Sequence, residues 1–351
     1  MTADRRRAFR NESGGGRSLL RTVFIFLGVF LWIPVTMGLV FYYLWVAVPY
    51  RGYPGSRLIL QVPHQSAQEV LRILQERGVI RRSPLGRLYL VLTGRAGDLK
   101  AGEYLFEGPM TAPQVLGKLI RGEIYYHKVT VPEGLRSGEI FAAFQREGFG
   151  NEEEFHAAFL DVTRIADLDP EATDLEGYLF PDTYYLARDA TARQVVDQMV
   201  HNNLGLWTSE WRRQAGSAGL TPRQVVTLAS LIEKETGRPE ERTLISSVFH
   251  NRIGKGMMLQ CDPTIIYALS MRSRYRGVIT RKDLDLDSRF NTYLHAGLPP
   301  GPIANPGRES LQAALFPDRT EFLYFVSMNN GRHTFSTNLQ DHSRAVRKYQ
   351  R

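Results

Sequence analysis

The chain has very little cysteine: Cys261 is the only one among 351 residues. An internal disulfide is therefore impossible, and any folded part must be stabilised by its core. The sequence also lacks paired cysteines, a His-Glu-x-x-His helix, a Walker loop and a Gly-x-Ser-x-Gly elbow. These absences remove most of the support for metal, nucleotide or serine-hydrolase chemistry, so we expect no metal and no cofactor.

Acidic residues are scarce at the start of the chain. Asp4 and Glu12 are the only acids in residues 1–21, which also hold six arginines: Arg5, Arg6, Arg7, Arg10, Arg17 and Arg21. This tail carries about half of the formal net charge of +8. The basicity therefore indicates membrane topology and does not indicate a nucleic-acid partner.

Residues 22–48 contain no Asp, Glu, Lys or Arg over 27 positions. A helix of that length, at ~1.5 Å per residue, crosses a hydrocarbon core of about 30 Å. A cleaved signal peptide and a buried core helix fit less well, because the first has a shorter apolar region. We expect a single transmembrane helix at 22–48, with Trp45 and Tyr50 as interfacial aromatics near its outer end.

The arginine-rich tail, residues 1–21, should remain in the cytoplasm under the positive-inside rule. No later segment is apolar over a spanning length, so the remainder of the chain should lie outside. The sequence therefore predicts a single-pass anchor with its N-terminus in the cytoplasm and the rest of the chain outside.

Residues 57–125 show the pattern of a small α+β module. We expect a strand at 58–62, a helix opened by Ser66 and closed by Gly78, a helix at 84–92, a strand at 101–108 and a helix between Thr111 and Gly122. This order is similar to a LysM-type glycan-binding module. A plain spacer between membrane and catalytic domain is the alternative.

Residues 126–351 are mostly helical in pattern, with clear helices at 192–203 and 221–235. Loops rich in Gly, Pro, Asn and Tyr interrupt the helices at 176–186, 259–269, 290–307 and 324–339. Loops of this composition are suited to holding a polar polymer. The predicted fold class is thus α+β, with a larger helical domain following the small module.

Two carboxylates stand near the end of one apolar helix, in "LASLIEKETG" at 228–237. On a helical wheel Glu233 and Glu235 lie about 200° apart, so they cannot point into one cleft. Glu235 lies beside Leu228 and Leu231, where partial desolvation favours a neutral, proton-donating carboxyl. Glu233 is better explained as a partner of a base such as Arg238 or Arg242; an ordinary solvated Glu-Lys-Glu face is the structural alternative for both.

From 129 to 349 the chain resembles the endolytic murein transglycosylase family, also called YceG-like or MltG. The motifs that carry the resemblance are "EGYLFPDTYYL", "LASLIEKET", "SVFHNRIGKGMMLQCDPTIIYAL", "NTYLHAGLPPGPIANPG" and "HTFSTNLQDH". "LIEKET" is also similar to the Ile-x-x-Glu-Ser pattern of goose-type lysozymes. The resemblance implies a lysozyme-like catalytic domain with β-rich loops and assigns Glu235 as the essential acid, with Glu233 still open.

The resemblance further implies a lytic transglycosylase that cuts peptidoglycan glycan strands internally and leaves 1,6-anhydro-MurNAc ends. It also implies a location in the bacterial inner (cytoplasmic) membrane with a periplasmic or extracytoplasmic catalytic domain, and penicillin-binding synthases as partners. We assign Asp262, Thr264, Asn291 and Tyr293 to substrate binding, because their polar groups suit sugar amides and hydroxyls. His333 is interpreted as a structural histidine.

Two alternatives remain open at this stage. The same glutamate could activate water in a hydrolytic muramidase, or the chain could be a non-catalytic glycan-binding scaffold of the wall-synthesis machinery.

Overall fold

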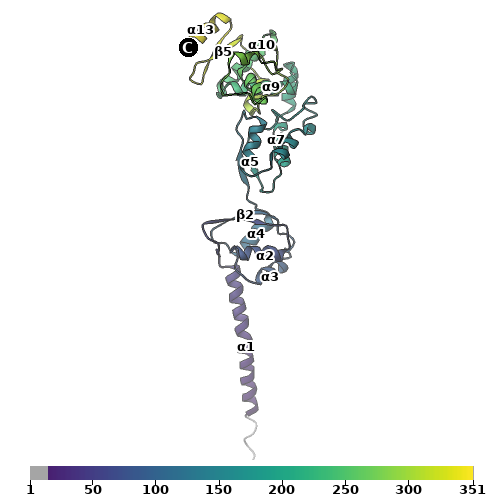
Figure 1. Cartoon of the computed structure of the whole chain (residues 1–351). Coiled ribbons are helices and arrows are strands. Elements are labelled where there is room, and N and C mark those ends of the chain that lie inside the picture. The colour runs from purple at the N-terminus through teal and green to yellow at the C-terminus, as the bar shows by residue number, and fades with distance from the viewer. Residues whose placement is uncertain (1–14, 351) are drawn as a thin grey trace, which may run out of the picture. The chain divides into compact units, whose positions relative to one another are not determined.

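The computed structural model describes residues 15–350, which form two compact units that divide between Tyr125 and Tyr126 (Figure 1). Helix and strand are mixed in both units. Of the predicted tail at 1–21, residues 1–14 lie outside the described residues, and Gly15 begins the first helix.

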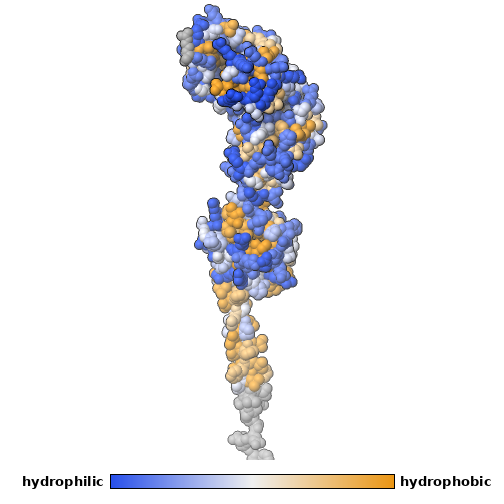
Figure 2. Space-filling model, in the orientation of Figure 1, coloured by the Kyte–Doolittle hydropathy of each residue, from blue (hydrophilic) through white to orange (hydrophobic). Residues whose placement is uncertain are grey.

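Helix α1 (Gly15–Val46) contains residues 22–46 of the apolar segment predicted at 22–48. Its stretch Arg21–Val46 has 26 residues, and the most apolar 18-residue window within it has a mean hydropathy of 2.4 and no buried residue. Figure 2 shows hydrophobic residues over much of the described surface of this helix. By length and composition α1 is compatible with a membrane span.

The rest of the first unit is built around one antiparallel strand pair. β1 (Arg57–Val62) pairs with β2 (Gly102–Glu107), in a register from Arg57 opposite Glu107 to Val62 opposite Gly102. The helices are α2 (Ala67–Glu76), α3 (Leu85–Leu92) and α4 (Ala112–Arg121). The observed order is therefore strand, helix, helix, strand, helix, as the sequence predicts.

Capping explains why these helices begin and end where they do. The Thr111 side chain accepts from the Gln114 backbone N–H, and the Gln114 side chain accepts in return from the N–H of Thr111. Gly122 ends α4 at φ +71°, a conformation that glycine adopts without strain. Trp45, expected to be an interfacial aromatic, is instead 3% exposed and packs against Tyr89 in the core of this unit.

The second unit is mostly helical, with two short strand pairs. β3 (His127–Thr130) pairs with β4 (Thr183–Leu186), and β5 (Tyr324–Ser327) pairs with β6 (His333–Ser336). The α-helices are α5 (Ser137–Arg146), α6 (Glu152–Phe159), α7 (Ala192–Leu204), α8 (Ser209–Ser217), α9 (Pro222–Glu235), α10 (Arg242–Gly254), α11 (Asp262–Met271), α12 (Arg308–Leu315) and α13 (Leu339–Tyr349). Short 3₁₀ turns occupy η1 (Val162–Arg164), η2 (Pro239–Glu241) and η3 (Arg281–Asp285).

Helix α9 runs through the core of the second unit. Thr221 caps its start in a reciprocal pair with Gln224, and Pro222 occupies the first turn. Leu228 and Leu231 are fully buried, and α12 packs closely along the helix. A helix so enclosed holds the side chains at its end in fixed positions.

Candidate active site

Glu235 is the last residue of α9, and its carboxyl group is half-buried at one wall of a cavity. The Cys261 thiol donates a hydrogen bond to Glu235 Oε1 at 3.0 Å. Burial raises the pKa of Glu235 above its ordinary value of 4.5, and the nearby charge of Asp262 acts in the same direction. The Cys261 thiol, His333 and Arg252 oppose that shift without reversing it. The carboxyl therefore holds its proton to a higher pH than an exposed glutamate does.

The cavity has a volume of about 380 Å³ and brings together residues that are distant in sequence. It is formed by the end of α9, by α10, by the start of α11, by the 290–307 loop, by the β5–β6 hairpin and by α13. Its lining residues are Glu235, Arg252, Leu259, Gln260, Asp262, Tyr293, Phe325, Val326, Ser327, His333, His342, Val346 and Gln350. Most are polar or aromatic, so the cavity can offer hydrogen bonds and ring faces to a polar ligand.

Two of the predicted substrate-binding residues share this cavity with Glu235. Asp262 is the first residue of α11, and the Tyr293 hydroxyl donates to Asp262 Oδ1 at 2.5 Å. Burial and the bond to Asp262 raise the pKa of Tyr293, so the phenol remains a neutral donor. Asp262 itself is exposed on the cavity side, where its second oxygen can accept from a ligand.

The other two predicted residues lie behind the cavity wall. Thr264 is fully buried, and its hydroxyl donates to the Cys261 carbonyl at 2.7 Å. Asn291 is also fully buried, and its amide donates to the carbonyls of Leu284 and Leu286 at 2.8 and 2.9 Å. Its own oxygen accepts from the Tyr293 backbone N–H. Both residues therefore hold the loops that carry Cys261 and Tyr293, and neither lines the cavity.

A second titratable pair stands across the cavity. His333 Nδ1 lies 2.7 Å from Glu241 Oε2, and the His333 backbone N–H donates to Glu241 Oε1 at 2.9 Å. Burial alone would raise the pKa of Glu241, but the hydrogen bonds from His333 outweigh it and the pKa lies below its ordinary value. An ionised carboxylate can only accept, so His333 Nδ1 carries a proton and donates it to Glu241.

Several lining residues were not predicted from the sequence. Gln260, Arg252 and His342 line the cavity and come from three separate segments, and His333 was interpreted as structural. Cys261 does not line the cavity but contacts it through its hydrogen bond to Glu235. A sequence signal existed for two of them, because Gln260 and Cys261 directly precede Asp262 in "LQCDPT". Gln260 also has a positive φ of 52°, which is strained for a residue other than glycine and is typical of functional loops.

Glu233 has a different environment. Its side chain is 6% exposed and lies 3.6 Å from the Arg242 guanidinium. Its Oε2 accepts from the Gly307 backbone N–H at 2.8 Å. Glu233 does not line the cavity, so the two glutamates face apart, as the helical wheel indicates.

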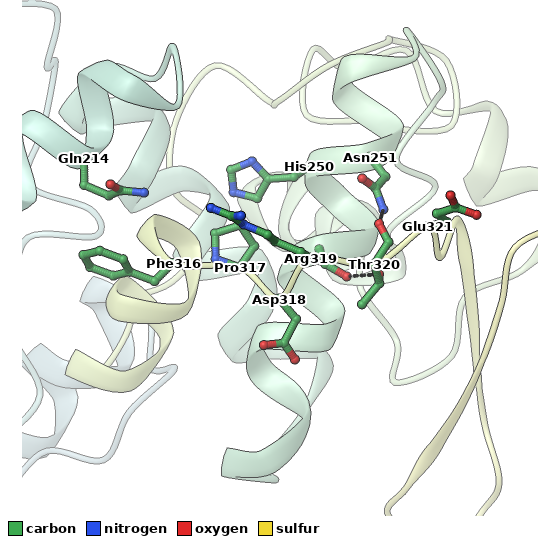
Figure 3. Close-up of a pocket in the computed structure, with 10 residues that line it drawn as sticks. Gln214, His250, Asn251, Phe316, Pro317, Asp318, Arg319, Thr320 and Glu321 are labelled. Carbon is green, nitrogen blue, oxygen red and sulfur yellow. Dashed lines mark hydrogen bonds between the residues drawn. The ribbon is translucent and has the colours of Figure 1, made fainter.

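Figure 3 shows a second hollow in the same unit, of about 680 Å³, near Gln214, His250, Asn251 and the 316–321 loop. The amide of Asn251 donates to the Thr320 carbonyl at 2.9 Å, and His250 Nε2 lies 2.9 Å from the Ala314 carbonyl. These groups fix the loop that follows α12. Neither Glu233 nor Glu235 lines this hollow, and none of the predicted substrate-binding residues does.

Within residues 15–350, no group of three or more His, Cys, Asp or Glu side chains is arranged to hold a metal ion.

Comparison with known proteins gives the class of this chain. A family model described as the YceG-like family matches residues 60–348. The chain is 33% identical over 299 residues to the endolytic murein transglycosylase of Bacillus subtilis (strain 168), covering 81% of this chain and 82% of that protein. The chain belongs to the YceG-like family.

Two further matches agree with this family assignment. The endolytic murein transglycosylase of Streptococcus pneumoniae (strain ATCC BAA-255 / R6) is 29% identical over 316 residues, which is 81% of this chain and 56% of that protein. Among solved structures, a YceG-like protein of Listeria monocytogenes matches with a TM-score of 0.56 and 30% identity, over 82% of this chain and 98% of the other.

Proposed function

We propose that this protein is a membrane-anchored lytic transglycosylase that cleaves the MurNAc–GlcNAc β-1,4 bond inside peptidoglycan glycan strands. The observation that carries the proposal is the Glu235 carboxyl, half-buried at a cavity wall with a raised pKa. The names of the Bacillus and Streptococcus relatives supply the substrate class.

The proposed reaction uses one glutamate twice. Glu235 donates its proton to the glycosidic oxygen as the bond from C1 of MurNAc breaks, and GlcNAc leaves with a free hydroxyl. The positive charge at C1 is shared with the ring oxygen or with the acetamido group. The C6 hydroxyl of the same MurNAc then attacks C1, and its proton returns to the Glu235 carboxylate. The product is a 1,6-anhydro-MurNAc end, and no water is consumed.

The surroundings of Glu235 support this double role. The Cys261 thiol binds Oε1, which leaves Oε2 for the substrate. The buried leucines of α9 keep solvent from the rear of the carboxyl. Asp262 and Tyr293 would bind sugar hydroxyls and amides on one side of the cavity, and Thr264 and Asn291 would contribute by holding that side in place.

The remaining parts of the chain complete the proposal. Helix α1 would anchor the protein in the inner membrane with its N-terminus in the cytoplasm, and the second unit would work outside as a lysozyme-like catalytic domain. The module at 57–125 would act as a LysM-like glycan-binding module, which its strand, helix, helix, strand order supports. Penicillin-binding synthases are the proposed partners.

The experiment is mass spectrometry of the muropeptides that the full chain releases from purified glycan strands. We expect the wild type to cut long strands internally and to leave anhydro-MurNAc ends on the fragments. Glu235→Gln should produce no such ends. Reducing MurNAc ends would instead make the protein a hydrolytic muramidase. Binding without any cleavage would make it a glycan-binding scaffold.

A further inference from the structure

A separate cavity lies in the first unit, at the point where α1 meets the folded module. Its volume is about 520 Å³. It is lined by residues from the last turns of α1, from the end of α2 and from the turn before α3: Phe41, Leu44, Trp45, Tyr50, Gly52, Gln75, Glu76, Gly78, Arg81, Arg82 and Ser83. The function proposed for the second unit makes no use of this cavity.

Two buried donors at this cavity lack a partner. Trp45 Nε1 and Arg81 Nε are both inaccessible to solvent, and neither makes a hydrogen bond within residues 15–350. Trp45 is 3% exposed, so water does not solvate its indole N–H in place of a protein acceptor. Buried donors without acceptors are rare because the desolvation cost is not recovered. Two of them at one cavity indicate a ligand that carries acceptor oxygens.

The charge of the cavity selects the kind of acceptor. Arg81 and Arg82 both line it, and the Arg81 guanidinium lies 4.8 Å from the centre of the Tyr50 ring, which fixes its plane. Glu76 is the one acid among the lining residues, and it is paired with Arg72 at 2.5 Å. The cavity is therefore net cationic, and a fixed guanidinium suits phosphate oxygens.

The cavity also has apolar lining residues. Phe41 and Leu44 belong to α1 and are 49% and 41% exposed. They continue the hydrophobic surface of the candidate membrane span, which ends within a few residues of Trp45. If α1 crosses the membrane, the cationic donors lie at the level of the lipid headgroups and the apolar lining residues lie at the level of the acyl chains.

We propose that this cavity binds one phospholipid with an anionic headgroup. On binding, the Trp45 and Arg81 side chains turn toward the ligand, so that Trp45 Nε1 and the Arg81 guanidinium donate to the phosphodiester oxygens. Arg82 adds positive charge, and an acyl chain lies along Phe41 and Leu44. A bound lipid would thereby tie the module to the membrane surface. This inference rests on the proposed membrane anchoring and is independent of the proposed catalysis.

The test is native mass spectrometry of the full chain in detergent with equal amounts of phosphatidylglycerol and phosphatidylcholine. We expect the wild type to retain one phosphatidylglycerol preferentially. Trp45→Phe keeps the ring and loses the N–H, and Arg81→Lys keeps the charge and loses the planar donor. Each should weaken retention by about tenfold, the effect of one charge-assisted hydrogen bond. Arg87→Gln, which removes an exposed arginine of α3 outside the cavity, is the matched control and should bind as the wild type does.

Equal retention by the wild type, Trp45→Phe and Arg81→Lys would overturn the proposal, as would equal retention of the two lipids by the wild type. Displacement of the lipid by inorganic phosphate alone, with no preference for phosphatidylglycerol, would make the cavity a phosphate site and also overturn it. Circular dichroism checks the fold of each variant. Flotation of the full chain with liposomes tests the anchor separately, so a failure of anchoring is distinguished from a failure of lipid binding.

Discussion

Glu233 and Glu235 lie on different sides of the end of α9, and their surroundings differ. On one side, Glu233 meets the Arg242 guanidinium at 3.6 Å and the Gly307 N–H at 2.8 Å. On the other side, Glu235 makes no ion pair within the described residues and accepts from the neutral Cys261 thiol. Burial without a paired cation favours the protonated form of Glu235. Glu233 instead lies against a guanidinium and a backbone N–H. The environment of Glu233 suits structure and that of Glu235 suits proton transfer.

The largest expected effect is on catalysis. Glu235→Gln should lower turnover by about 10²- to 10⁴-fold, because it removes the acid and the base together. Glu233→Gln should keep most of the wild-type turnover, measured per molecule of folded protein. The measurement is the rate of appearance of anhydro-MurNAc ends for the two variants, side by side. Equal losses would mean that the two sides of α9 do not differ in role.

Glu235→Gln should also change the pH dependence of stability. The pKa of Glu235 is raised in the folded state. Its contribution to the free energy of unfolding is therefore fully present below pH 4.5, the ordinary pKa, and is lost as the pH rises through the folded-state pKa. Glutamine cannot ionise, so the variant should unfold at a higher temperature than the wild type at neutral pH, with the difference vanishing in acid. Calorimetry across this range checks it; a variant less stable than the wild type at neutral pH would contradict a raised pKa.

The next effect is on stability through Glu233. Arg242→Met should destabilise the second unit by about 3–5 kcal/mol, because it leaves the buried Glu233 carboxylate without its cation. The double change with Glu233→Gln should recover part of that loss, since the only carboxylates that then lack Arg242 are the partly exposed Glu133 and Glu309. Thermal unfolding of the three variants measures this. A double variant that is no more stable than Arg242→Met would show that Glu233 is not the group that Arg242 stabilises.

A smaller effect is expected at His333. His333→Ala should lower turnover by about three- to tenfold, the range for one lost hydrogen bond between Nε2 and a sugar hydroxyl. Glu241→Gln is the companion change, because it removes the carboxylate that orients the ring while leaving the ring in place. Steady-state kinetics of both variants checks the effect. Unchanged turnover in both would return His333 to a structural role.

The smallest effect concerns the Cys261 thiol. Its hydrogen bond lowers the pKa of Glu235, so Cys261→Ala should raise that pKa further. Glu235 must be protonated to donate, and the alkaline limb of the pH–rate profile should therefore move to higher pH. Cys261→Ser keeps a donor at the same position and should leave the limb near its wild-type place. A limb that moves to lower pH in Cys261→Ala would contradict the assigned hydrogen bond.

The sequence predicts the first unit well because its signals are local. Ser66, Thr111 and Gly122 mark helix ends through contacts within three or four residues, and the two strands of the module lie within a residue of their expected bounds. The burial of Trp45 was missed because it depends on Tyr89, which is far away in sequence. Hydropathy alone cannot separate a residue at a membrane interface from one in an adjoining core.

The candidate site was harder to predict, for a related reason. The helical wheel was sufficient to separate Glu233 from Glu235, because both lie on one regular helix. Thr264 and Asn291 were assigned to substrate, but their side chains bond to backbone carbonyls that only the folded loops bring near. His333 lies 92 positions from Glu241, so no local pattern could reveal their pairing.

The most direct test of the account is a crystal structure of Glu235→Gln with a GlcNAc–MurNAc oligosaccharide bound. We predict that the sugar occupies the cavity between Asp262, Tyr293 and His333, with a glycosidic oxygen about 3 Å from the side chain at position 235. A sugar bound instead in the hollow near His250 and Arg319, with the Glu235 cavity empty, would contradict it.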